Sequence, residues 1–206
     1  MIIPAILTDK KNEFIRMADL SSEFTDYVQI DIMDGSFVPS KSINLDDLVD
    51  CNIKTKFEAH LMVCDPLAWV ETFKKIGAEK IIYHFEIEKD LLEITAKIRE
   101  QGLKVGVAIK PSTKISDFEY LVDKIDSVLF MAVNPGFYGA EFIPGVLDKI
   151  KKFKSNYPEK LVGIDGGVKL DNLRKVKETG LDIICVGSAI FNNSNPKQAY
   201  QEFVNY

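Results

Sequence analysis

Short apolar segments recur along the chain, and each is followed by a longer segment in which apolar residues return every three or four positions. The first pattern is typical of buried strands and the second of amphipathic helices. We expect strands at 2–7, 27–32, 56–63, 80–85, 104–109, 127–133, 160–165 and 182–187. We expect helices near 11–22, 44–50, 66–77, 89–101, 114–123, 143–155, 171–179 and 196–204. Glycines stand where three of these helices are expected to end: Gly77, Gly102 and Gly180.

Eight alternations of strand and helix favour a parallel sheet. A chain of 206 residues lies at the small end of the range for closed (β/α)8 barrels. An open doubly wound sheet is the alternative, but no GxGxxG follows the first strand. The sequence shows no linker, no low-complexity tract and no sign of a second domain. It therefore predicts the α/β class, with one domain over residues 1–206 folded as a single (β/α)8 TIM barrel.

Composition and charge narrow the class of partner. The chain is 46% hydrophobic and 28% charged, which is ordinary for a soluble domain, and its net charge of −5 disfavours nucleic acid and acidic membranes. The three cysteines include no CxxC pair, so we expect reduced thiols in a cytoplasmic protein. The apolar residues at the start are too few for a signal peptide or a membrane span.

Polar residues fall at the ends of the predicted strands, where active sites of such barrels lie. These residues are Gln29 and Asp31, Glu58 and His60, His84 and Glu86, and Asp165. A lone buried histidine is more often a hydrogen-bonded core residue than a functional one. Two histidines and two aspartates at one rim instead favour a functional role for Asp31, His60 and Asp165. For His84 both interpretations stay open.

Methionines and glycines gather at the same rim. Met33, Met62 and Met131 follow three strands, either as adaptable core residues or as an apolar floor beneath a planar intermediate. Gly166, Gly167, Gly187 and Ser188 follow the last two strands, where barrels often bind phosphate through backbone N–H groups. Plain tight turns are the alternative. The long loop 132–145 suggests a lid carrying Phe137 and Tyr138, with Gly136 and Gly139 as further phosphate contacts.

In order and spacing, seven stretches resemble the ribulose-phosphate 3-epimerase family almost end to end. They are DIMDGSFVP (31–39), HLMV (60–63), HFE (84–86), GVAIKPST (106–113), VNPGFYG (133–139), DGGV (165–168) and VGSAIF (186–191). The resemblance implies a (β/α)8 barrel that inverts C3 of a ketose phosphate, converting D-ribulose 5-phosphate to D-xylulose 5-phosphate. It also implies a homo-oligomer and a small-molecule sugar phosphate as the partner.

The same resemblance assigns roles to the residues at the rim. Asp31 and Asp165 match the two aspartates that exchange the C3 proton from opposite faces. Together with His60 they match ligands of a divalent metal that binds substrate O2 and O3. The glycines and Ser188 match the phosphate site, and the three methionines match the floor. Such a metal would stabilise the enediolate that forms when the weakly acidic C3 proton leaves.

This chain departs from the family pattern at three positions of that site. Gln29 replaces a histidine ligand, and an oxygen donor in place of nitrogen weakens zinc or iron and relatively favours manganese or magnesium. The expected cofactor is therefore one divalent ion, Zn, Fe, Mn or Co, of uncertain identity, and a site without tightly bound metal stays open. Ala5 stands where the family has serine, and Tyr138 replaces a glycine in the lid.

Three functions compete on these observations. The first is a ketose-phosphate 3-epimerase, with another ketose phosphate as substrate as a variant suggested by Ala5 and Tyr138. The second is a phosphate-binding barrel lyase of the orotidine-phosphate decarboxylase and hexulose-phosphate synthase group. Its Asp-x-Lys strand is absent from FEAHLMV (57–63), which argues against it. The third is a sugar-phosphate-binding relic without catalysis, suggested by Gln29.

Overall fold

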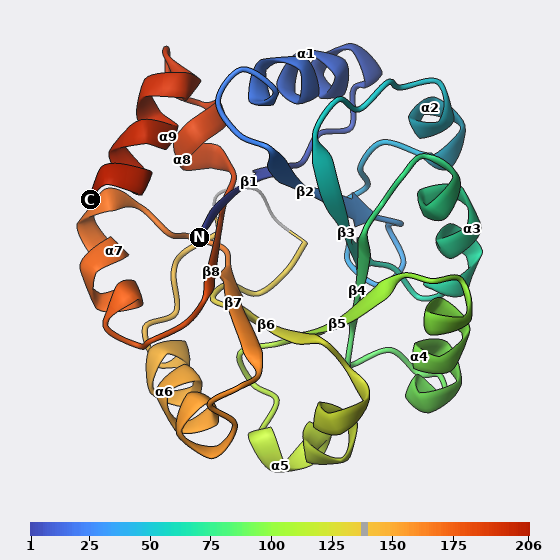
Figure 1. Ribbon diagram of the computed structural model, residues 1–206, viewed down its shortest axis with the longest axis vertical. Coiled ribbons are helices and arrows are strands. Elements are labelled where there is room, and N and C mark those ends of the chain that lie inside the picture. The colour runs from blue at the N-terminus through green and yellow to red at the C-terminus, as the bar shows by residue number, and fades with distance from the viewer. Residues whose placement is uncertain (137–139) are drawn as a thin grey trace.

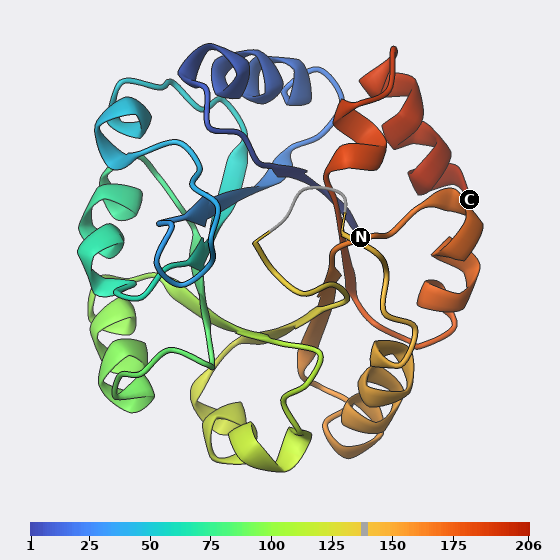
Figure 2. The ribbon, with the colours of Figure 1, turned by 180° about the vertical axis from the view of Figure 1, so that it is seen from behind.

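The computed structural model describes residues 1–136 and 140–206. Its strands form one closed parallel barrel in sequence order, and a ring of helices surrounds the barrel (Figures 1 and 2). The strands are β1 (Ile2–Ile6), β2 (Tyr27–Met33), β3 (Lys56–Met62), β4 (Lys80–His84), β5 (Lys104–Ile109), β6 (Ser127–Met131), β7 (Leu161–Asp165) and β8 (Ile183–Val186). Because β1 pairs with β8, the sheet is closed and the alternative of an open sheet is excluded.

The helices lie close to the expected ranges. They are α1 (Lys11–Ser21), α2 (Leu45–Val49), α3 (Leu67–Lys75), α4 (Leu91–Glu100), α5 (Ile115–Phe118), α6 (Val146–Asn156), α7 (Leu170–Lys177), α8 (Ser188–Phe191) and α9 (Pro196–Asn205). Two differences have local causes. A 3-10 helix, Glu119–Lys124, continues α5, and the short α8 begins directly after Gly187, in a stretch too brief to show helical periodicity.

Local chemistry explains where several helices begin and end. The side chains of Asn44, Asp90 and Asn195 accept hydrogen bonds from backbone N–H groups in the first turns of α2, α4 and α9. Gly102 and Gly180 follow α4 and α7 with φ of 78° and 75°, the left-handed conformation that closes a helix at little cost for glycine. The expected helix ends are confirmed at these glycines.

Two apolar layers follow from the alternation of side chains along each strand. One face of each strand packs against the helices, in a continuous core that includes Phe118, Phe130 and Phe153. The other face fills the interior of the barrel, where Ile82, Leu129 and Ile183 belong to a second cluster. The interior is therefore a packed core and not a channel, and polar side chains inside it need partners.

A buried ion pair lies at the amino-terminal end of the strands. Glu58 on β3 is directly opposite Lys80 on β4, and their Oε2 and Nζ atoms are 2.5 Å apart. Glu58 is 1% exposed and Lys80 is 7% exposed, so this pair is shielded from water. Glu58 therefore lies at the opposite end of the barrel from the strand ends at which the sequence pattern had grouped it with His60. Among the described residues, none of the helices combines the length and apolarity that crossing a membrane requires.

Candidate active site

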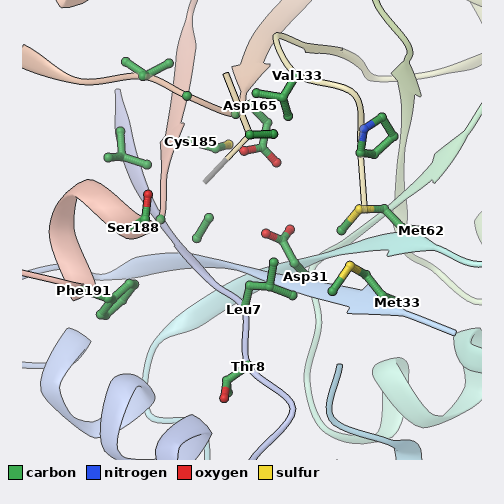
Figure 3. Close-up of a pocket in the computed structure, with 18 of the residues that line it drawn as sticks. Leu7, Thr8, Asp31, Met33, Met62, Val133, Asp165, Cys185, Ser188 and Phe191 are labelled. Atoms are coloured by element: carbon green, nitrogen blue, oxygen red, sulfur yellow. The ribbon is translucent and has the colours of Figure 1, made fainter. Parts of the chain in front are cut away.

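A cavity of about 720 Å³ opens at the carboxyl ends of the strands, within the size range of small-molecule sites. Two acidic side chains reach it from different strands, Asp31 from β2 and Asp165 from β7, and they point toward one another (Figure 3). The residues predicted for the phosphate site and the floor line the same cavity: Met33, Met62, Met131, Gly136, Gly166, Gly167, Gly187 and Ser188. The structure thus brings most of the predicted site residues together.

His60 joins the two aspartates beneath this cavity. Its Nδ1 lies 3.0 Å from Oδ1 of Asp31 and 3.4 Å from Oδ2 of Asp165. The three residues each offer one donor atom, and these atoms lie within 4.8 Å of one another. One imidazole and two carboxylates, all buried, form a donor set that suits a divalent cation with positions left for other ligands. The residues present therefore fit the expected metal.

Gln29 lies deeper than the sequence pattern suggested. It is the third residue of β2, which continues to Met33, so Gln29 is fully buried and does not line the cavity. Its Nε2 lies 2.8 Å from Oδ1 of Asp31 and 2.8 Å from Oδ2 of Asp165, and it donates to both. Its Oε1 accepts a hydrogen bond from Sγ of Cys185 at 3.1 Å. The amide carbonyl therefore faces away from the carboxylates.

His84 continues this buried network on the other side of His60. Its Nε2 is 3.0 Å from Nε2 of His60, and its Nδ1 is 3.4 Å from Oε2 of Glu86. Burial and the adjacent His60 lower the pKa of His84 to about 4, so His84 is neutral and can accept the Nε2 proton of His60. With Nε2 of His60 engaged in this contact, Nδ1 of the same ring faces the two aspartates. His84 is thus a buried residue that is hydrogen-bonded to His60.

The charges in the cluster depend strongly on one another. Burial and the charge of Asp165 raise the pKa of Asp31 to about 6. Burial opposes protonation of His60, but its hydrogen bonds to Asp165 and Asp31 outweigh that effect and raise its pKa to about 10. Without a cation, an imidazolium therefore compensates the two carboxylates. A bound cation must displace the Nδ1 proton, because a metal ligand needs a free lone pair.

The methionines form the wall beside Asp31. Met33 and Met62 are nearly fully buried, pack against Val38 and lie side by side next to the carboxylate (Figure 3). Met131 belongs to the interior cluster and also borders the cavity. All three present apolar, polarisable atoms and no acidic proton to a ligand in the cavity. This placement is compatible with the floor that was predicted.

The glycines after β7 and β8 bring backbone close to the cavity. Gly166 and Gly167 have φ of 101° and 67°, a conformation that other residues rarely adopt. A Cβ on Gly166 would lie 2.5 Å from Val133, and one on Gly187 would lie 3.1 Å from the carbonyl oxygen of Ala5. Ser188 begins α8 next to them and is exposed. The backbone N–H groups can therefore approach an anion closely.

The predicted lid is described only in part. Gly136 borders the cavity with φ of 106°, and its carbonyl oxygen accepts a hydrogen bond from Oγ of Ser40. Phe137, Tyr138 and Gly139 lie outside the described residues, so their predicted roles stay predictions.

Sequence reasoning did not assign Cys185 to the site. The residue is 1% exposed and donates to Gln29, so it belongs to the same buried network. The period of two was the available signal, because Cys185 on β8 lies two positions before Gly187, which directly follows the strand and was assigned to the phosphate site.

We expect Gly166→Ala to raise the KM for a phosphorylated substrate by about tenfold, because the methyl group collides with Val133 and displaces the loop after β7. Gly180→Ala is the matched control, since Gly180 also has a positive φ but no atom within 4 Å of an added Cβ. Steady-state kinetics and thermal unfolding of both variants separate binding from backbone strain. Equal KM values in the two variants would contradict an anion-binding role for this loop.

Comparison with known proteins gives a consistent result. The model described as "Ribulose-phosphate 3 epimerase family" matches residues 1–191. The ribulose-phosphate 3-epimerase of Synechocystis sp. is 36% identical, over 97% of this chain and 90% of its own length. That of Bacillus subtilis is also 36% identical, over 89% of this chain and 88% of its own. The crystal structure of 3-hexulose-6-phosphate synthase from Salmonella typhimurium superposes with a TM-score of 0.72. It is 16% identical and covers 99% of this chain and 96% of that one, so this likeness concerns the fold alone.

Proposed function

Because this chain belongs to the ribulose-phosphate 3-epimerase family, an isomerase family, we propose that it epimerises a ketose phosphate at C3, with D-ribulose 5-phosphate and D-xylulose 5-phosphate as the pair. The observation that carries the proposal within the site is the placement of Asp31 and Asp165. Their carboxylates come from strands on different sides of the cavity and point toward one another (Figure 3). Inversion at carbon requires one group to remove the proton and another to return it from the opposite side.

The two aspartates serve this chemistry in both directions. One carboxylate accepts the C3 proton and the other, protonated, delivers a proton to the other face of the flat enediolate. In the reverse direction the roles are exchanged, so two groups of the same type suit the task. In the absence of a cation, burial and the charge of Asp165 raise the pKa of Asp31 to about 6, which makes it a better base than an exposed aspartate.

A divalent cation fits beside them. Asp31, Asp165 and Nδ1 of His60 would hold it, and the cation would supply positive charge that stabilises the enediolate. His84 contributes by holding the ring of His60 in the required orientation. The three methionines cover the cavity wall without offering a competing proton, which protects the intermediate from unwanted protonation. We propose that this cation is Zn, Fe, Mn or Co.

The phosphate end of the substrate would lie on the other side of the cavity. Gly166, Gly167 and Gly187 present backbone there, and Ser188 adds a hydroxyl. Anchoring the phosphate fixes C3 between the two carboxylates, so binding energy far from the reacting carbon is used to orient it. With this anchor, we expect a phosphorylated sugar to be preferred over the free sugar.

The decisive experiment is to incubate purified protein with ribulose 5-phosphate in heavy water, with each divalent metal and with a chelator. We expect deuterium to be incorporated at C3 and xylulose 5-phosphate to form, and both processes should be faster with metal. NMR and mass spectrometry measure them. Exchange with a different ketose phosphate but not with ribulose 5-phosphate would change the substrate and keep the reaction. Tight binding of ribulose 5-phosphate without exchange under any metal would instead identify a binding protein.

A further inference from the structure

Gln29 occupies the centre of the buried cluster without reaching the cavity. Its side chain comes from the middle of β2 and is fully buried. It contacts Asp31 on its own strand, Asp165 on β7 and Cys185 on β8. A substrate in the cavity meets the two carboxylates but not the amide, because Asp31 and Asp165 line the cavity and Gln29 does not. Any effect of Gln29 on the reaction therefore acts through these neighbours.

The hydrogen-bonding capacity of the amide fixes its orientation. The amide has two N–H groups and one carbonyl, and the two N–H groups match the two carboxylate oxygens, each at 2.8 Å from Nε2. The opposite orientation would place Oε1 against two negatively charged oxygens. Cys185 favours the observed orientation as well, since its thiol donates to Oε1 at 3.1 Å. Every donor and acceptor of the amide is thus satisfied.

We propose that Gln29 is a positioning residue that holds Asp31 and Asp165 at a fixed separation through its two N–H groups, is not a metal ligand, and is itself oriented by Cys185. The cation site then has three protein ligands, Asp31, His60 and Asp165, and the amide lies behind them. The proposed hydrogen bonds of Gln29 and its absence from the metal ligands are inferred from the contacts alone. Only the effect on proton transfer rests on the proposed function.

The residues that coordinate the cation can be identified directly, without measuring enzymatic turnover. Crystals are soaked in Mn²⁺, and the ion is located by its anomalous scattering. We expect Mn²⁺ among Asp31, His60 and Asp165, with no atom of Gln29 within about 2.4 Å of it, since metal–ligand bonds to oxygen are about 2.0–2.2 Å. A Gln29 atom at bonding distance would overturn the proposal, because only the carbonyl can ligate. Absence of Mn²⁺ from the three donors would overturn the three-ligand site.

Metal affinity gives a second readout that is also independent of activity. Gln29→His should raise the affinity for Zn²⁺, measured by competition with a chelator, by at least about tenfold, because the imidazole adds a fourth ligand where the amide supplies none. An unchanged affinity would contradict the proposal, because an added imidazole would then find no vacant coordination position at the cation. Circular dichroism and thermal unfolding establish that the variant is folded.

Two variants of Cys185 test how the amide is oriented. Cys185→Ser keeps a donor, whereas Cys185→Ala removes it and leaves Oε1 without a partner. We expect Cys185→Ala to lower kcat by about tenfold with KM nearly unchanged, and Cys185→Ser to restore most of kcat. Equal kcat for the two variants would overturn the role of Cys185. If the wild-type protein does not turn over ribulose 5-phosphate, the proposed function fails, and the Mn²⁺ and Zn²⁺ results still decide the role of Gln29.

Discussion

Replacing either Asp31 or Asp165 by asparagine should slow epimerisation by about 10²–10⁴-fold, the usual contribution of a positioned acid or base. Each variant should nevertheless keep deuterium exchange at C3 with one of the two epimers. The remaining carboxylate can remove the proton that faces it and return deuterium to the same side. The two variants should therefore show opposite preferences, one exchanging ribulose 5-phosphate and the other xylulose 5-phosphate.

The measurement is deuterium incorporation into each epimer separately in heavy water, at matched metal occupancy. Each variant is the control for the other, because both lose one carboxylate from the same metal site. A general loss of metal or of folding would suppress exchange with both epimers equally. Exchange of both epimers by a single variant would contradict the two-base mechanism and would point to one base that reaches both faces.

Lys80→Met should lower the free energy of unfolding by about 3–5 kcal/mol, the usual cost of leaving one member of a buried ion pair without its partner. Glu58 is 1% exposed, and its Oε2 lies 2.5 Å from Nζ of Lys80. The double variant Glu58→Leu with Lys80→Met should recover much of this loss, since no isolated charge stays in the interior. Denaturant titrations of the three proteins measure the differences.

Lys56→Met is the matched control for this pair. Lys56 and Glu79 form an ion pair between the same two segments of chain, but 70% of the Lys56 side chain is exposed. Exposed pairs contribute about 0–1 kcal/mol, so this control should be nearly as stable as the wild type. Similar losses for Lys56→Met and Lys80→Met would show that burial at the amino-terminal end of the barrel does not determine the cost.

Much of the fold was predictable because each strand and helix carries its own local signal. Apolar runs and three- to four-residue periods located the strands and the longer helices, and glycines such as Gly102 and Gly180 marked helix ends. The four-residue α8 was not predictable, because one helical turn has no measurable period. The depth of Gln29 was missed because alternation along a strand shows which face a side chain takes but not how far it lies from the barrel rim. The structure places Gln29 four positions before Met33, the end of β2.

Residue types and their positions at strand ends predicted the cluster of Asp31, His60 and Asp165, because a barrel gathers these ends at one rim. The direction of each hydrogen bond was not available from the sequence. The amide of Gln29 could present oxygen or nitrogen to its neighbours, and the positions of Asp165 on β7 and Cys185 on β8 distinguish the two. Such choices depend on contacts between residues far apart in the chain, which no local pattern encodes.

Closure of the barrel between β1 and β8 has a consequence for synthesis on the ribosome. Gln29 and Cys185 are 156 residues apart, and Gln29 and Asp165 are 136 apart. While the nascent chain is being made, Gln29, Asp31 and His60 emerge early and stay hydrated, because the strands that bury them do not yet exist. The dehydration of these groups is postponed until β7 and β8 appear with their partners, so the growing chain does not have to bury an uncompensated charge.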